Sequence, residues 1–201
     1  MKILAFTDIH GSYSALRRIE QKAKNQSIDL VVCCGDITIF EHGIRPILKR
    51  LNKLDKKIAV VHGNHENEKT FLRYSKMFGN IIFLHKRHLI WKNFVFLGYG
   101  GGGFSDVDDE FEQTSKTKFK KIMSANKEKK IILLTHAPPY KTKLDRLASG
   151  FCGNKSIRHF LEKNRIDLSI CGHIHENFGK EDRIKKTRII NPGPFGRFIE
   201  I

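Results

Sequence analysis

Apolar residues gather in short runs along the chain, and each run ends at a glycine or a polar residue. Five runs are apolar at nearly every position, as expected of strands covered on both faces in a parallel sheet. They span residues 2–7, 28–34, 58–61, 131–134 and 167–171. Between the first three runs, apolar residues repeat at helical spacing, first behind the N-cap candidate Ser12 and then from Ile44 to Leu54. The first third of the chain is therefore predicted to follow a β-α-β-α-β order.

The spacing of the apolar runs changes in the middle of the chain. After a short helical pattern at residues 71–78, three runs follow in close succession at residues 81–84, 88–91 and 94–97. Gaps this short favour hairpins over helical crossovers. We therefore expect an antiparallel meander here, and with it a second sheet.

Two further helices are predicted in the second half of the chain. One runs from about Asp108 to Asn126, with acidic residues first and lysines last, an order that suits the helix dipole. The other begins behind the N-cap candidate Asn154. Residues 141–151 show no strong period and are expected to form a long loop, and strands at 187–190 and 197–201 close the chain. Since no repeat or linker divides the sequence, we expect residues 1–201 to form a single domain.

The composition sets limits on the class of protein. With 40% hydrophobic and 29% charged residues, a chain of 201 residues is expected to be globular and to bury a core. No apolar run is long enough to span a membrane, and the N-terminus lacks the pattern of a signal peptide. The four cysteines show no Cys-x-x-Cys spacing, so we expect free thiols and a cytoplasmic protein.

The net charge of +16 favours anionic partners, including phosphate-bearing substrates. A lysine-rich solvated surface accounts for the same charge. The lysines between residues 116 and 121 fit a solvated helix end better than a dedicated nucleic-acid patch. The charge therefore permits a nucleic-acid partner without requiring one.

Polar residues that bind metals follow five of the predicted strands. In an open α/β sheet, ligands bind at the carboxyl ends of the strands, so these side chains are expected to meet. Five imidazoles, two carboxylates and one amide, without a thiolate, favour Mn, Fe, Zn, Ni or Co over a closed structural zinc site. Eight ligands are too many for one ion with an open position and suit two ions about 3.5–4 Å apart. The eight residues are Asp8, His10, Asp36, Asn64, His65, His136, His173 and His175.

Each of these residues taken alone has a simpler explanation. Asp8 or Asp36 could cap a helix, Asn64 could stabilise a turn, and His136 could be an interior histidine with a backbone partner. The recurrence of such residues at five strand ends makes the metal site the better interpretation. The other histidines match no motif and are expected to be ordinary residues, namely His42, His62, His85, His88 and His159.

Four consecutive glycines at residues 100–103 predict a loop. They lack the sequence context of a dinucleotide site or of a phosphate-binding P-loop. We expect this loop at the rim of the site, where its amides can face a substrate. Substrate specificity is expected to reside in the loops 100–109 and 141–153.

Five short motifs follow one another along the chain: Asp8-Ile9-His10, Gly35-Asp36, Gly63-Asn64-His65-Glu66, Thr135-His136 and Gly172-His173-Ile174-His175. Their order resembles that of the calcineurin-like metallophosphoesterases over residues 3–193. A smaller set of motifs, including His136-Ala137-Pro138-Pro139 and Asn191-Pro192-Gly193, resembles a largely archaeal, Icc-like branch of these phosphoesterases. The resemblance implies an α/β fold, a four-layer α/β/β/α sandwich of two mixed sheets flanked by helices.

The resemblance also implies a role for each matching residue. Asp8, His10, Asp36 and His175 would hold one metal ion. Asp36, Asn64, His136 and His173 would hold the second, so Asp36 would bridge the two ions. His65 would contact the phosphoryl group beside Asn64 and protonate the leaving oxygen. Asp36 and His65 are therefore the expected catalytic residues.

The leading functional hypothesis is a metal-dependent phosphohydrolase that cleaves phosphomonoesters or phosphodiesters by in-line attack of a metal-bridging hydroxide. Two divalent ions outweigh the charges of Asp8, Asp36 and the hydroxide, which leaves a site that suits a phosphate anion. Manganese is the metal we expect first, with Fe, Ni, Co, Zn and Mg as alternatives. The expected partner is a phosphate-ester substrate, which includes a nucleotide or nucleic acid. The competing hypotheses are a nuclease and a non-catalytic scaffold on the same fold.

Overall fold

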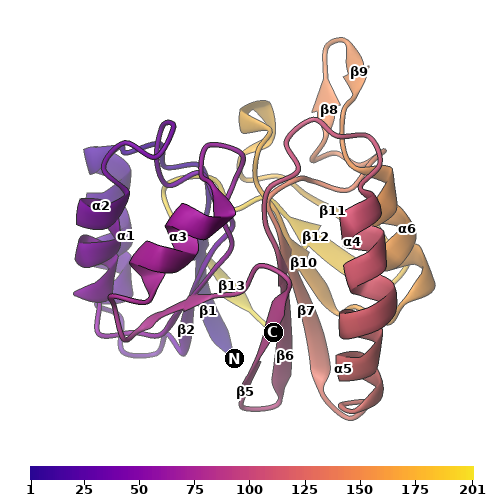
Figure 1. Cartoon of the computed structure of the whole chain (residues 1–201), viewed down its shortest axis with the longest axis horizontal. Coiled ribbons are helices and arrows are strands. Elements are labelled where there is room, and N and C mark those ends of the chain that lie inside the picture. The colour runs from indigo at the N-terminus through magenta and orange to yellow at the C-terminus, as the bar shows by residue number, and fades with distance from the viewer.

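The computed structural model describes residues 1–201. Two β-sheets lie face to face in the middle of the molecule, and helices cover the outer face of each sheet (Figure 1). Side chains of both sheets, such as Ile3 and Val32 of the first and Phe96 and Ile132 of the second, form one apolar core between them. The molecule thus has the four-layer α/β/β/α arrangement expected from the sequence.

The first sheet has the strand order β13-β1-β2-β3-β4. Its strands β1 to β4 run parallel, and the edge strand β13 is antiparallel to β1. The strands are β1 (Lys2–Phe6), β2 (Leu30–Cys33), β3 (Ile58–Val60), β4 (Ile81–Phe83) and β13 (Arg197–Glu200).

The second sheet has the strand order β11-β12-β10-β7-β6-β5. Its four central strands run parallel, and the edge strands β11 and β5 are antiparallel to their neighbours. The strands are β5 (Arg87–Trp91), β6 (Phe94–Tyr99), β7 (Lys130–Thr135), β10 (Leu168–Ile170), β11 (Glu181–Ile184) and β12 (Thr187–Ile190).

Each outer layer of helices packs on its sheet through a core of its own. One core joins the first three helices to β1–β4, and the other joins the later helices to the second sheet. The predicted N-caps Ser12 and Asn154 both accept a backbone N–H with their side chains. The helices are α1 (Tyr13–Ala23), α2 (Ile44–Asn52), α3 (Glu68–Ser75), α4 (Asp109–Thr114), α5 (Lys120–Ser124) and α6 (Lys155–Lys163), with a π-helical turn η1 (Ser115–Phe119) and a 3₁₀ turn η2 (His175–Asn177). No helix combines the length and the apolar character needed to cross a membrane.

The expected antiparallel meander is wrong in its first strand. Residues 81–83 form β4, which pairs parallel to β3 in the first sheet, and only β5 and β6 form a hairpin. The reason is that α3 provides a crossover between β3 and β4. The chain then changes sheets within three residues, because Leu84 donates its N–H to Val60 O in the first sheet and Lys86 donates to Gly98 O in the second.

Two short elements escaped the sequence prediction. The expected loop at 141–151 contains a small hairpin, β8 (Arg146–Leu147) and β9 (Gly150–Phe151). Strands of two residues are too short to produce a period in the sequence. The edge strand β11 was missed because its sequence is mostly charged, which is typical of edges protected from further pairing.

The carboxyl ends of β1, β2 and β3 lie at the same end of the molecule as those of β7 and β10. The β8–β9 hairpin projects from this end (Figure 1). The loops that follow these five strands therefore meet across the two sheets, which is where the predicted metal ligands lie in the sequence.

Candidate metal centre

The structure brings all eight predicted residues together at this end. Seven of them form three overlapping groups, and within each group the donor atoms lie within 4.8 Å of one another. The eighth, Asn64, joins them because its Oδ1 lies 2.9 Å from His136 Nε2. The groups are Asp8, His10 and His175; His10, Asp36 and His65; and Asp36, His136 and His173.

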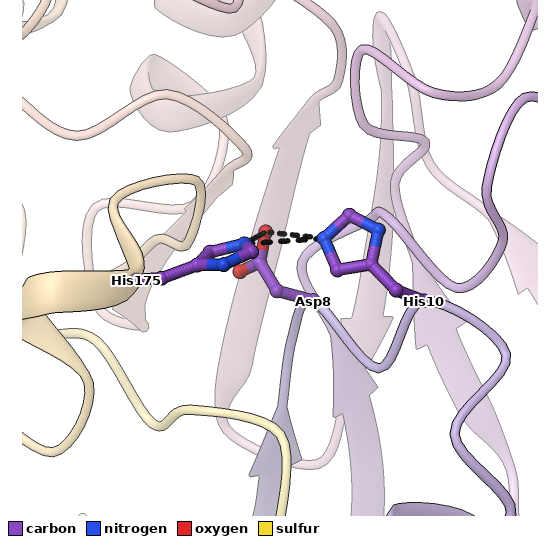
Figure 2. Close-up of side chains that lie close together, drawn as sticks. All are labelled: Asp8, His10 and His175. Atoms are coloured by element: carbon purple, nitrogen blue, oxygen red, sulfur yellow. Dashed lines mark hydrogen bonds and ion pairs between the residues drawn. The ribbon is translucent and has the colours of Figure 1, made fainter.

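The first group gathers at the end of β1. His10 and His175 direct their imidazole rings at Asp8 (Figure 2), with His175 Nε2 at 3.6 Å and His10 Nε2 at 3.9 Å from Asp8 Oδ1. The two Nε2 atoms lie 3.1 Å apart. Asp8 is buried, and its carboxylate is fixed by two hydrogen bonds, since Thr7 Oγ1 and the N–H of His173 donate to its Oδ2. Three donor atoms that converge from one strand end and a distant loop suit a divalent cation.

The third group, with Asp36, His136 and His173, lies deeper between the sheets. His136 is fully buried, and its Nε2 lies 3.3 Å from Asp36 Oδ2, while its Nδ1 donates to Cys34 O at 2.8 Å. The Nε2 of His173 is buried without a hydrogen-bond partner. Burial of a ring nitrogen costs its hydration free energy, and this cost is not compensated unless a hydrogen-bond partner or a metal ion binds the nitrogen. A metal ion in this group would satisfy that nitrogen, so the residues present fit the predicted ligand set.

Asp36 belongs to the third group and also faces the first. Its Oδ2 lies 3.8 Å from His10 Nε2 on one side and 3.3 Å from His136 Nε2 on the other. The N–H of His65 donates to its other oxygen, Oδ1, at 2.9 Å. A carboxylate placed in this way has the position expected of a ligand shared by two ions.

Four of the eight residues have an uncommon backbone conformation. Asp8, His10, Asp36 and His173 have φ values of 52°, 43°, 49° and 72°. This left-handed region is costly for residues with a side chain, at about 1–3 kcal/mol each, and such residues concentrate at functional sites. Here the turn from strand into left-handed conformation aims the side chains across the sheet edge.

Two glycines allow the strand ends to approach one another closely. A Cβ on Gly172, which follows β10, would overlap Thr7 Oγ1 and Asp8 Oδ2 of the first sheet. A Cβ on Gly63, which follows β3, would overlap Asp36 Oδ1. Glycine is therefore required at both positions by the close approach of a neighbouring carboxylate.

A cavity of about 300 Å³ opens above the two groups. His65 lines it, with its Nε2 4.0 Å from Asp36 Oδ2. The N–H of Phe40 donates to His65 Nδ1 at 3.4 Å, which leaves the proton of a neutral ring on Nε2. The lining residues are His10, Asp36, Asn64, His65, Phe104, Leu147, His173, Ile174, His175 and Glu176.

Comparison with known proteins decides the family. The family model of the calcineurin-like phosphoesterases matches residues 1–177. The chain belongs to this family. An uncharacterized protein of Methanocaldococcus jannaschii is 33% identical over 99% of this chain and 91% of its own length.

Solved structures share the fold of this phosphoesterase. The protein TT1561 of Thermus thermophilus superposes with a TM-score of 0.76 at 17% identity, over 96% of this chain and 88% of its own. A dimetal phosphatase from Danio rerio superposes with a TM-score of 0.66 at 12% identity, over 94% of this chain and 86% of its own. At this level of identity the likeness establishes the fold alone.

The charges of the phosphoesterase site are coupled through Asp36. Burial alone would raise the pKa of Asp36, but the hydrogen bond and charge of His136 outweigh it and lower the pKa to about 2. Burial alone would lower the pKa of His136, but Asp36 raises it to about 9. Burial and the charge of His136 lower the pKa of His173 to about 4. At neutral pH the ring of His136 is therefore protonated on both nitrogens in the metal-free site, and a divalent ion would displace the proton on Nε2.

Glu66 is a functional residue whose role the sequence did not reveal. It is buried, and each of its oxygens accepts two hydrogen bonds. Oε1 accepts from the N–H and Oγ1 of Thr38, at 2.9 and 2.8 Å. Oε2 accepts from the N–H groups of Asp36 and Gly63, at 3.1 and 2.9 Å. Glu66 therefore fixes the backbone of Asp36, and its place in the Gly63-Asn64-His65-Glu66 motif was the available sequence signal.

Two histidines expected to be ordinary lie directly behind the site. The rings of His62 and His85 are 4.6 Å apart between centroids. His85 Nδ1 accepts the N–H of Gly100 at 2.9 Å, and the O of His62 accepts the N–H of Gly101 at 2.9 Å. Both residues therefore hold the glycine loop at the rim, as positioning residues outside the metal centre.

Proposed function

We propose that the protein is a phosphohydrolase that cleaves phosphomonoesters or phosphodiesters with the help of two divalent metal ions. The observation that carries this proposal is the position of Asp36, whose carboxylate lies between two groups of imidazole and carboxylate donors. Membership of the calcineurin-like phosphoesterase family supports the same class of reaction. The shared fold with a dimetal phosphatase agrees with it.

The residues present divide into two ligand sets around this shared carboxylate. When bound, the two ions would supply Lewis acidity and a water of lowered pKa for in-line attack at phosphorus. Manganese is the metal we propose, because nitrogen and oxygen donors without thiolate suit it; Fe, Ni, Co, Zn and Mg are compatible with the same donors. One ion would be held by Asp8, His10, Asp36 and His175, and the other by Asp36, Asn64, His136 and His173.

The protein's own groups bind and protonate the substrate. Asn64 and His65 line the cavity, where they can donate hydrogen bonds to the phosphoryl oxygens. His65 carries its proton on Nε2 because Nδ1 accepts the N–H of Phe40. This proton is therefore available to the oxygen of the leaving group. The net charge of +16 raises the local concentration of an anionic phosphate ester.

Metal addition to stripped protein tests the proposal. The substrates are p-nitrophenyl phosphate and bis-p-nitrophenyl phosphate, with Mn²⁺, Ni²⁺, Co²⁺, Mg²⁺ or Zn²⁺ added singly. We expect at least one ion to restore turnover, and we expect Asp36→Asn to remove that turnover. If no ion produces turnover although two ions bind per chain, the result would favour a non-catalytic scaffold.

A further inference from the structure

Two phenylalanines beside the candidate metal centre are exposed to solvent. Phe40 is 69% exposed and Phe104 is 67% exposed. Phe40 follows β2 of the first sheet, and Phe104 follows β6 of the second. Phe104 lines the cavity, and Phe40 lies beside it against His65, which also lines it.

Each ring contacts an imidazole that lines the cavity. The ring centroid of Phe104 lies 4.4 Å from that of His173, in an edge arrangement. The centroid of Phe40 lies 4.6 Å from that of His65, at an interplanar angle of 39°. Leu147 of the β8–β9 hairpin adds a further apolar side chain to the cavity wall. Phe104 and Leu147 therefore give the polar cavity an apolar wall, and Phe40 extends this apolar surface at its edge, which together form an aromatic rim.

The backbone that carries the exposed Phe40 ring has an unfavourable conformation. Phe40 and Glu41 have φ values of 45° and 66°. They are fixed there because Phe40 N–H donates to His65 Nδ1 and Glu41 N–H donates to His65 O at 3.1 Å. Strain that is retained around an exposed aromatic ring indicates a functional surface.

The charge at the rim restricts what the rings can bind. Glu176 lines the same cavity with an exposed carboxylate. A second anionic group on the substrate would be repelled there, whereas a neutral planar group would stack on the phenyl rings. We propose that Phe40, Phe104 and Leu147 form a subsite for a neutral, planar aromatic ester group of the substrate. This inference rests on the proposed phosphohydrolase function.

Binding of phosphonates, whose C–P bond is not hydrolysed, tests the subsite without turnover. The Mn²⁺-loaded protein is titrated calorimetrically with phenylphosphonate and with ethylphosphonate. We expect the phenyl compound to bind about 3- to 10-fold more tightly. In Phe40→Ala/Phe104→Ala this preference falls below about 2-fold, and Phe104→Leu retains less of it than Phe104→Tyr, because leucine is apolar but not planar.

A matched control is Phe198→Ala, which removes a phenylalanine that is 39% exposed on β13. It is expected to keep the full preference. A third probe, the phosphonate analogue of thymidine 5′-monophosphate, distinguishes two sources of the aromatic group. Tighter binding than phenylphosphonate assigns the subsite to a nucleobase, and weaker binding assigns it to a small aryl group.

Hydrolysis of bis-p-nitrophenyl phosphate by the same samples separates the two proposals. If the protein shows turnover but binds the two phosphonates equally, the subsite is wrong and the function stands. The same conclusion holds if the double variant keeps the preference for the phenyl compound. A phenylalanine-dependent preference without turnover would overturn the function and leave the subsite. If the Mn²⁺-loaded protein binds neither phosphonate and shows no turnover, both proposals are wrong.

Discussion

The Glu66→Gln substitution tests how the protein holds Asp36 in place. Glutamine has the size of glutamate, but its NH₂ group cannot accept a hydrogen bond. In one orientation the NH₂ group faces the N–H of Asp36 and Gly63, and in the other it faces Thr38. The second orientation is the less costly, because Thr38 Oγ1 can turn to accept from the NH₂ group and only the Thr38 N–H loses its partner.

The expected cost follows from that orientation. One buried backbone N–H without a partner costs about 1–3 kcal/mol. The remaining hydrogen bonds also lose the charge of their acceptor, whereas relief of the repulsion between Glu66 and Asp36 offsets part of this. We therefore expect the free energy of unfolding to fall by about 2 kcal/mol. For a chain of this length, that loss lowers the melting temperature by about 4–8 °C.

Chemical denaturation of the metal-free protein measures this loss, with Glu68→Gln as the matched control. Glu68 pairs with Lys86 at 3.3 Å, but its side chain is 43% exposed, so its substitution should cost no more than about 1 kcal/mol. Calorimetry should also show Mn²⁺ affinity lowered about 10-fold in Glu66→Gln, because the anchor of Asp36 is lost. Equal stability of the two variants would refute this account of Glu66.

Three further predictions concern the site itself. In Gly172→Ala the new Cβ overlaps Asp8 Oδ2, so we expect the free energy of unfolding to fall by about 1–3 kcal/mol. Because Asp8 is displaced, we also expect calorimetry to show that Mn²⁺ binding is lost. In His65→Ala we expect bound metal to be retained and kcat to fall about 10²- to 10⁴-fold, measured by metal analysis and steady-state kinetics. The third prediction concerns the pH dependence of the metal-free protein. The pKa of His136 is about 9 in the folded protein, against 6.5 for an ordinary histidine, so His136 stabilises the fold fully below pH 6.5 and loses this contribution as the pH rises through 9. The pKa of Asp36 is about 2 in the folded protein, against 3.8 for an ordinary aspartate, so Asp36 loses its contribution only as the pH falls from 3.8 through 2. Burial acts in the opposite sense on three other histidines, because it lowers the pKa of His173 to about 4 and that of His62 and His85 to about 3, so they destabilise the fold as the pH falls below 6.5. The melting temperature should therefore be highest near pH 6.5, decline toward pH 9 through His136, and decline toward pH 4 through these buried histidines.

Control variants distinguish these effects from a general loss of stability that any substitution could cause. Gly79→Ala adds a Cβ that has no atom within 4 Å, so it should leave stability and Mn²⁺ binding nearly unchanged. His88→Ala removes an exposed histidine of β5 and should keep full turnover. The pH account requires that Asp36→Asn flatten the decline between pH 6.5 and 9. A decline that survives in Asp36→Asn, or full turnover in His65→Ala, would contradict the respective prediction.

The sequence predicted the layers of the fold well where strands were buried on both faces. Runs such as residues 30–34 and 131–134 are apolar without interruption, because each strand lies between another sheet and a layer of helices. The meander prediction failed at β4 because spacing along the chain does not show which sheet a short strand joins. That choice is made by the hydrogen bonds of Leu84 and Lys86, which are tertiary.

The candidate site was predicted from residue types at strand ends, since parallel strands bring their carboxyl ends together. The sequence could not assign Glu66, because its partners are mainly backbone groups brought close by folding. The aromatic rim was also beyond prediction. An isolated phenylalanine in a loop, such as Phe40, gives no sign of its exposure or of the imidazole beside it.

The anomalous difference map of a crystal grown with Mn²⁺ tests the central claim most directly. The account predicts two peaks about 3.5–4 Å apart with the carboxylate of Asp36 between them. One peak should lie among Asp8, His10 and His175, and the other beside His136 and His173. A map with no peak at this end of the sheets, or with a single peak that Asp36 does not contact, would contradict it.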